Sequence, residues 1–114
     1  MSSGWVGIDL DGTLARYEPG YSGKQLIGEP IPAMAAHVRR WLLEGQELRI
    51  VTARAAQGGE MRHKISDWFF HHFGTRVMVT DKKDRDMICL YDDRCRQVIF
   101  NTGELVNKPH DQET

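Results

Sequence analysis

The sequence predicts one small α/β domain built on a parallel β-sheet. Short runs rich in Val, Ile and Leu alternate along the chain with longer segments whose apolar residues recur at helical spacing. This alternation is typical of a parallel sheet with helices on both faces, joined by right-handed crossovers. The 114 residues fit one domain. We expect residues 1–106 to form this doubly wound core and the polar residues 107–114 to be a disordered tail.

The expected strands are short apolar runs bounded by turn-forming residues. They are Trp5–Leu10, Leu48–Thr52, Arg76–Thr80, Met87–Tyr91 and Gln97–Phe100. The sequence therefore predicts a sheet of about five strands.

Two segments between these runs have the spacing of amphipathic helices. The first opens at Ile31-Pro32, because proline is favoured at the first helical position, and Gly45 is its expected cap. The second carries an apolar stripe from Met61 to His72 and should stop at Gly74. Residues 15–30 show no period and are rich in Gly, Pro and polar residues, which predicts a loop or flap.

Composition excludes several classes of partner. The formal net charge is −1, from 15 basic and 16 acidic residues, so no global field attracts nucleic acid or an anionic membrane. No apolar run approaches the roughly 20 residues that span a bilayer, and no signal peptide is visible, so we expect a soluble cytoplasmic protein. Cys89 and Cys95 lack metal-ligand spacing and are expected to be reduced thiols, with Cys89 in a buried strand.

Polar residues follow four of the expected strands. Asp9 and Asp11 follow the first strand, Thr52-Ala53-Arg54 the second, Lys82-Lys83 the third and Asp92-Asp93-Arg94 the fourth. The carboxyl ends of parallel strands meet at one edge of the sheet, where ligands of open α/β sheets bind. We therefore expect these groups to converge.

Converging carboxylates cannot all remain ionised without a cation, since like charges raise one another's pKa. Oxygen ligands without His or Cys favour a hard divalent ion such as Mg²⁺. That combination suits phosphoryl transfer, in which Asp9 would attack phosphorus and Asp11 would exchange protons with the leaving oxygen and with water. Thr52 would donate its hydroxyl to a phosphoryl oxygen, and the lysine would supply positive charge.

The segment Asp-Leu-Asp-Gly-Thr at 9–13, Thr52, the downstream lysine and Asp92-Asp93 resemble, in order, the four motifs of haloacid dehalogenase-like phosphohydrolases. The stretches IGEPIP, VTAR, KDRDMICLYDDR and NTG resemble those of small phage- or prophage-associated members. The resemblance implies a three-layer Rossmann-like fold with strand order 5-4-1-2-3, Mg²⁺ dependence and Asp9 as nucleophile. It also implies that Asp11 gives its backbone carbonyl to the metal. Most relatives carry a cap domain after the first or second motif, whereas here each of those intervals is expected to hold only a loop and one helix.

Several assignments stay open within this resemblance. Lys83 is favoured over Lys82 as the catalytic lysine, and Asp93 over Asp92 as the direct metal ligand, although the order of the two acids could be reversed. Gly12, Thr52, Ala53 and Arg54 are the expected substrate-binding residues, with Arg54 equally consistent with a surface ion pair. For Arg94, a surface ion pair is favoured over substrate binding.

Two other functions share features of this pattern. A receiver domain also gathers acids, a hydroxyl and a lysine around Mg²⁺, but its acid pair follows the first strand, whereas here an adjacent pair follows the fourth. The other rival is an idle phosphate-binding or phage accessory module with the same fold, since a fold does not establish turnover. The expected partner is a phosphorylated substrate, with nucleic acid only in that role. The sequence does not indicate an oligomeric state.

Overall fold

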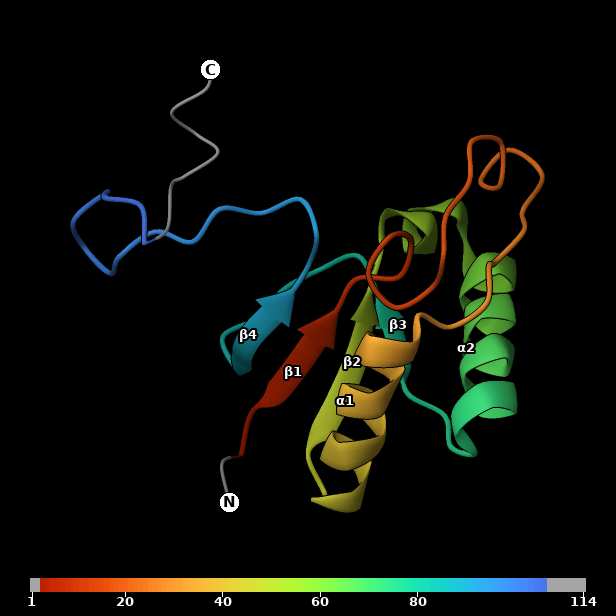
Figure 1. Cartoon of the computed structure of the whole chain (residues 1–114), viewed down its shortest axis with the longest axis horizontal. Coiled ribbons are helices and arrows are strands. Elements are labelled where there is room, and N and C mark those ends of the chain that lie inside the picture. Colours follow the sequence, from red (N-terminus) through yellow and green to blue (C-terminus); the bar gives the residue numbers. More distant parts are fainter. Residues whose placement is uncertain (1–2, 107–114) are drawn as a thin grey trace.

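The computed structural model describes residues 3–106 and contains a parallel sheet of four strands (Figure 1). In chain order the elements are β1 (Trp5–Ile8), α1 (Pro32–Leu43), β2 (Glu47–Val51), the 3₁₀ helix η1 (Ala53–Gln57), α2 (Gly59–Phe73), β3 (Met78–Thr80) and β4 (Met87–Tyr91). All strand pairs are parallel, and the spatial order is β3-β2-β1-β4. The α/β class is confirmed, and the order is the expected one without its fifth member.

The prediction of a fifth strand at Gln97–Phe100 is wrong. Val98 forms only an isolated antiparallel bridge with Leu105, and the segment after β4 runs away from the sheet (Figure 1). The Ile99 N–H donates to the Glu104 carbonyl and the Val106 N–H to the Gln97 carbonyl. These backbone groups are satisfied by a local turn instead of the edge of β4, a choice that apolar composition alone does not reveal. The predicted tail at 107–114 lies outside the described residues.

The helix boundaries follow the signals in the sequence. Pro32 occupies the first turn of α1, directly after the extended Ile31. Gly74 ends α2 in the left-handed conformation at φ 79°, and its N–H donates to the Phe70 carbonyl. Gly45, at φ 79°, follows α1 in the same way. Glycine adopts this conformation without the steric cost of a Cβ, so both predicted stops are confirmed.

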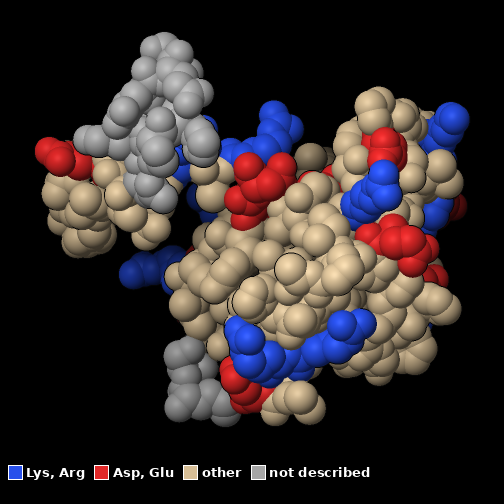
Figure 2. All heavy atoms as spheres, in the orientation of Figure 1, with Lys and Arg blue, Asp and Glu red and all other residues tan. Residues whose placement is uncertain are grey.

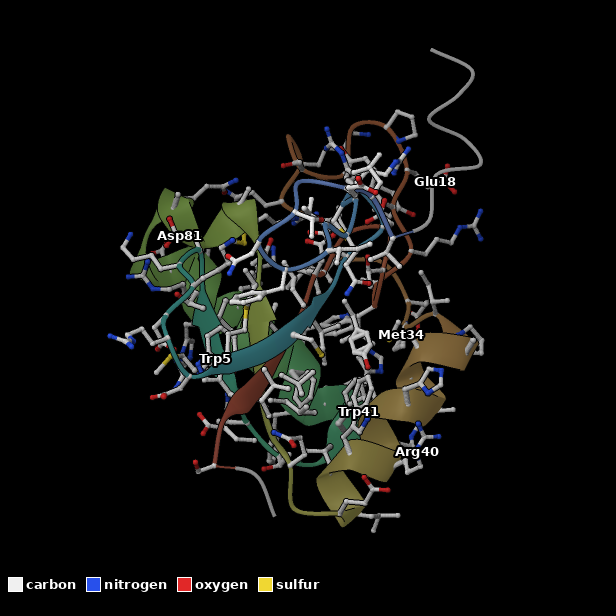
Figure 3. The ribbon with its side chains drawn as sticks, turned by 90° about the vertical axis from the view of Figure 1, so that its left-hand side faces the viewer. Trp5, Glu18, Met34, Arg40, Trp41 and Asp81 are labelled. Carbon is white, nitrogen blue, oxygen red and sulfur yellow. The ribbon has the colours of Figure 1, made fainter. Side chains whose placement is uncertain are left out.

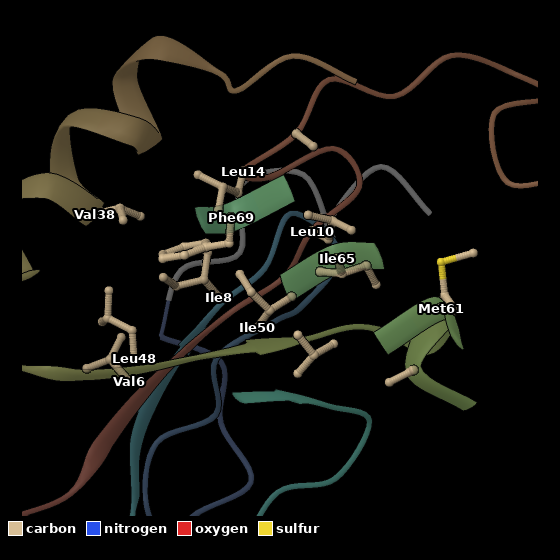
Figure 4. Close-up of a cluster of buried hydrophobic side chains, with 13 residues drawn as sticks. Val6, Ile8, Leu10, Leu14, Val38, Leu48, Ile50, Met61, Ile65 and Phe69 are labelled. Carbon is tan, nitrogen blue, oxygen red and sulfur yellow. The ribbon is translucent and has the colours of Figure 1, made fainter. Parts of the chain in front are cut away.

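Both α-helices pack on one face of the sheet. Val6 and Ile8 of β1 and Leu48 and Ile50 of β2 share a buried cluster with residues from α1 and α2 (Figure 4). The helical contributions are Val38 from α1 and Met61, Ile65 and Phe69 from α2. Right-handed crossovers that run repeatedly in one direction, from β1 to β2 to β3, place their helices on the same side.

The expected third layer is therefore absent from the described chain. Strands β1 to β3 are added toward one edge of the sheet, whereas β4 is added on the other side of β1. A helix on the second face would belong to the connection from β3 to β4, and that connection is only the short segment 81–86. The prediction of helices on both faces was wrong because it considered the alternation of elements and not the length of this one interval.

Trp5 covers part of the face that lacks helices. Its side chain is 1% exposed, and it lies on the side of the sheet opposite Trp41 of α1 (Figure 3). The indole Nε1 donates to Asp84 Oδ1 at 2.7 Å, and the Arg49 guanidinium lies 4.3 Å from the ring centroid. A Cβ at Gly7 would lie 3.1 Å from Cζ3 of this indole, so the glycine leaves room for the ring. The Trp5 ring and the 81–86 connection thus take the place of a helix there.

Cys89 lies in β4 as predicted, but its side chain is exposed, contrary to the expectation of burial. β4 is an edge strand, and the described helices cover only part of it, so Cys89 can be exposed. Within residues 3–106, no helix combines the length and hydropathy required to cross a membrane.

Candidate active site

Three carboxylates meet where β1 and β4 end. Asp9 follows β1, and its backbone N–H donates to the Tyr91 carbonyl at 2.8 Å, which holds it beside the end of β4. Asp92 and Asp93 follow β4 directly. One oxygen from each of the three carboxylates can be chosen so that all lie within 4.8 Å of one another. The predicted convergence of these acids is present.

Thr13 joins the two segments that carry these acids. Its hydroxyl donates toward Asp93 Oδ1 at 2.8 Å, accepts from the Asp93 N–H at 3.0 Å and lies 3.4 Å from Asp9 Oδ2. The side chain is buried, so these contacts are shielded from competing water. Thr13 was not predicted as a site residue, although it belongs to the Asp-Leu-Asp-Gly-Thr segment and follows Asp11 by two residues.

Asp11 lies apart from the three-acid cluster and pairs with Arg54. The Arg54 Nε is 2.8 Å from Asp11 Oδ2, and Nη2 is 2.9 Å from Oδ1. This is a two-point ion pair with parallel hydrogen bonds. The Asp11 side chain therefore points to η1, and its expected contribution to a metal, through the backbone carbonyl, stays a prediction.

Gly12 allows the chain to turn between Asp11 and Thr13. It adopts φ +84°, and a Cβ there would lie 3.1 Å from Asp93 Oδ2. Both constraints favour glycine, because other L-residues rarely adopt this φ and a methyl group would press on a clustered carboxylate. Gly12 borders a neighbouring cavity together with Asp92 and Asp93 and does not line the cavity described below.

Thr52 terminates β2 and caps η1. Its N–H donates to the Thr80 carbonyl at 2.9 Å, and its hydroxyl accepts from the Arg54 N–H at 3.2 Å. A threonine N-cap explains the abrupt change from strand to 3₁₀ helix. The capping bond uses the hydroxyl as an acceptor, so its own proton remains available for donation.

A cavity of about 610 Å³ lies beside Asp9, Asp92, the Asp11–Arg54 pair and Thr52. It is bordered by Asp9, Asp11, Ser22, Val51, Thr52, Ala53, Arg54, Gln57, Asp81, Asp92 and Arg94. Figure 2 shows acidic and basic side chains gathered at the end of the molecule toward which the arrows of β1 and β4 in Figure 1 point. The predicted residues Asp9, Asp11, Thr52, Ala53, Arg54 and Asp92 thus share one cavity.

Four residues of this cavity were not predicted to lie there. Ser22 comes from the loop 15–30, Val51 ends β2, Gln57 lies in η1 and Asp81 follows β3. Arg94, whose sequence context favoured a surface ion pair, is an exposed cation at the cavity wall. Its expected place beside the acids, directly after Asp92-Asp93 at a strand end, is therefore present.

The lysines following β3 are exposed and do not border this cavity. Lys82 lies 3.4 Å from Asp81 Oδ1 through its Nζ, and Asp81 is the residue of this connection that lines the cavity. Lys83 is likewise exposed. The assignment of Lys83 as the catalytic lysine stays a prediction.

The electrostatics of the acid cluster are most visible at Asp9. Burial, the charge of Asp92 and a hydrogen bond with Asp93 together raise the pKa of Asp9 to about 7. In the absence of a cation, the carboxyl group at the end of β1 therefore holds its proton near neutral pH. When ionised, the acids at this edge repel one another, and a bound cation would relieve that repulsion. The cluster contains no His or Cys ligand among the described residues, which favours a hard cation.

Comparison with known proteins supports the fold alone. No family model and no curated protein matches this chain. Among solved structures, the chain is similar to that of a conserved protein from Bacteroides thetaiotaomicron, with a TM-score of 0.61 and 20% sequence identity. The similarity covers 82% of this chain and 78% of that one. The shared feature is a Rossmann-like α/β architecture.

Proposed function

We propose that this protein is a Mg²⁺-dependent phosphatase that hydrolyses a phosphate monoester through an aspartyl-phosphate on Asp9. The observation that carries the proposal is the meeting of Asp9, Asp92 and Asp93 within 4.8 Å, beside a cavity that also presents Asp11, Thr52 and Arg94. The resemblance of these segments to haloacid dehalogenase-like phosphohydrolases supports the same chemistry.

The donor set fits a hard divalent cation. Asp9 and Asp92 or Asp93 would hold Mg²⁺ through carboxylate oxygens, with the Asp11 carbonyl as a further ligand. When bound, Mg²⁺ would neutralise charge on the phosphoryl oxygens and allow Asp9 to be ionised at neutral pH.

The chain's own residues account for the two chemical steps. A carboxylate oxygen of Asp9 forms a bond to phosphorus as the ester oxygen leaves, and Asp11 gives its proton to that oxygen. Asp11 then takes a proton from a water molecule that attacks the same phosphorus. The bond between phosphorus and Asp9 breaks, which regenerates the carboxylate and releases inorganic phosphate. Thr52 donates its hydroxyl proton to a phosphoryl oxygen throughout.

Metal removal tests the proposal directly. The protein should hydrolyse p-nitrophenyl phosphate in Mg²⁺, and EDTA should reduce the rate to that of the buffer, with recovery when Mg²⁺ is added in excess. The cation offsets the repulsion among the acids and the charge of the substrate, so the reaction requires it. Turnover in a verified metal-free preparation would contradict the mechanism. No turnover on a panel of mononucleotides, sugar phosphates, phosphopeptides and phosphorylated oligonucleotides would favour the idle binding module.

The pKa of Asp9 predicts how pH and Mg²⁺ act on stability. The folded protein keeps the Asp9 proton up to about pH 7, whereas the unfolded chain loses it near pH 3.8. The native state therefore binds more protons between these values, and the stabilisation from Asp9 is lost as pH rises through 7. We expect the metal-free melting temperature to fall from pH 5 to pH 8 more steeply than that of Asp9→Asn.

Mg²⁺ competes with that proton. Addition of millimolar Mg²⁺ should raise the melting temperature more at pH 8 than at pH 5, because at pH 5 the ion must displace a proton from Asp9. Calorimetry at both pH values measures the difference. An equal rise at both values would show that Asp9 is not part of the ion site.

The two lysines give a paired comparison. If Lys83 neutralises charge during phosphoryl transfer, Lys83→Ala should lower kcat by about 10²-fold, comparable to the loss of one preorganised charge-stabilising donor. Lys82→Ala is the matched control, since both side chains are exposed and its neighbour Asp81 lies at the cavity wall. Equal losses, or a larger loss for Lys82→Ala, would reverse the assignment.

A further inference from the structure

Arg54 is almost completely buried, although it borders the candidate cavity. Its side chain is 3% exposed, whereas that of Asp11 is 23% exposed. Side-on pairing with Asp11 uses Nε and one proton of Nη2. In this arrangement Nε and Nη2 of the guanidinium are directed at Asp11, so neither is free to grip a substrate while the pair is intact.

The same guanidinium also contacts the loop 15–30, which we call the flap loop. The Arg54 Nη2 donates to the Leu26 carbonyl at 2.7 Å. The flap loop is closed at its base by an antiparallel bridge between Ala15 and Pro30, and it supplies Ser22 to the cavity wall. One nitrogen thus connects the flap loop to the carboxylate of Asp11.

Two residues of α2 hold the flap loop without touching Asp11. The Lys64 Nζ donates to the Gln25 carbonyl at 2.5 Å, and the Trp68 Nε1 donates to the Gly28 carbonyl at 3.0 Å. The flap loop therefore has three side-chain attachments to one side of the domain. Of these three attachments within the described residues, the one from Arg54 alone continues to a residue with proposed chemistry.

A purely stabilising role explains this arrangement poorly. The Arg54 Nη1 is buried and has no hydrogen-bond partner among the described residues. A buried charge with an unsatisfied donor is a weak source of stability compared with an apolar side chain of similar volume. The geometry is better explained by what Arg54 holds in place.

We propose that Arg54 is a positioning residue that fixes the Asp11 carboxylate and ties it to the flap loop, so that the loop bordering the substrate also sets the orientation of the proton-transferring group. The assignment of proton transfer to Asp11 rests on the function proposed above. The flap loop then takes part of the place of a cap domain, since it borders the cavity and is coupled to the chemistry.

The kinetic test compares Arg54→Lys with Arg62→Lys, each assayed on p-nitrophenyl phosphate and on glycerol phosphate. Arg62 is a matched control, because it donates to a backbone carbonyl, that of Ala55, and does not touch Asp11. A nitrophenolate departs without a proton and an alkoxide requires one. Arg54→Lys should therefore lower kcat for glycerol phosphate about 10- to 100-fold more than for p-nitrophenyl phosphate. Equal losses on the two substrates would overturn the positioning role in favour of direct substrate binding.

Two further variants separate the links. Trp68→Phe removes the attachment to Gly28. It should change kcat for both substrates by the same factor, without altering the dependence of kcat on the leaving group. In an Asp11→Asn background, Arg54→Lys should cost less than about threefold on glycerol phosphate, since a residue that acts through Asp11 has nothing left to position. Additive losses in that double variant would overturn the proposal.

Amide hydrogen exchange gives a readout that does not need activity. The Leu26 N–H donates to the Tyr21 carbonyl within the flap loop. Its exchange should become faster in Arg54→Lys and in Asp11→Asn, but not in Arg62→Lys. If the wild-type protein hydrolyses no phosphate ester, the proposed function fails and exchange alone decides the structural link. Should Arg54→Lys not fold, Asp11→Asn still decides it. Unchanged exchange at Leu26 in the folded variants would overturn the link.

Discussion

Asp9→Asn should reduce hydrolysis to background, a fall of at least about 10³-fold in kcat, as expected when a nucleophile is removed. The amide keeps the shape of the carboxylate and loses its attacking charge, so no phosphoenzyme can form. Asp9 is held beside β4 by its backbone bond to Tyr91, which the substitution does not alter. The fold should therefore persist, and removal of one of three opposing acids should leave the metal-free protein at least as stable at pH 8.

Asp11→Asn is the informative companion to that variant. Its backbone remains, and loss of a proton donor and base should cost about 10²- to 10⁴-fold, least for substrates with good leaving groups. Beryllium fluoride, which mimics an acyl phosphate, should label Asp9 in the wild type and in Asp11→Asn, as mapped by peptide mass spectrometry or NMR. Label on Asp11, or full activity in folded Asp9→Asn, would contradict the proposed mechanism.

Of the substitutions proposed, Trp5→Ala should lower the free energy of unfolding the most. Truncation of a buried Trp costs about 3–5 kcal/mol, a large part of the 5–15 kcal/mol typical of a domain. The indole covers Gly7, stacks with Arg49 and bonds to Asp84, so its removal uncovers the face that has no helix. Urea denaturation followed by circular dichroism would measure the change in the free energy of unfolding.

Trp5→Phe provides the control for that result. It keeps an aromatic ring beside Arg49 and removes the N–H that bonds to Asp84, so its cost should be smaller, about 1–2 kcal/mol. A loss for Trp5→Ala below 1 kcal/mol would show that the 81–86 connection covers this face without the ring. Loss of phosphatase activity in folded Trp5→Phe would instead indicate that Asp84 helps to place the residues near Asp81.

The parts of the fold that the sequence predicted are those controlled by local signals. Pro32, Gly45 and Gly74 mark helix ends by their own backbone preferences, and apolar runs identified β1 to β4. Gln97–Phe100 has a similar composition, yet its fate depends on whether the edge of β4 or a local turn supplies its hydrogen bonds. Competition of that kind is decided by the whole chain.

The site shows the same division. Strand-end position was sufficient to bring Asp9, Thr52 and Asp92 to one cavity, because parallel strands share a direction. The pairing of Asp11 with Arg54 depends on side-chain rotation after the backbone is placed, and so does the contact of Thr13 with Asp93. Ser22 reaches the cavity only because the flap loop folds back, which no periodicity indicates.

The place of β4 in the sheet has a consequence for how the protein folds. β4 is the last of the described strands and pairs with β1, the first, so the two strands that precede the acids meet although most of the described sequence lies between them. Pairing of strands so distant in sequence is expected late in folding, because the intervening chain loses conformational freedom. During synthesis, β1, β2 and β3 can associate before β4 has left the ribosome. We therefore expect a nascent chain that lacks β4 to have most of its apolar core but not the three-acid cluster, which is completed only when β4 pairs with β1.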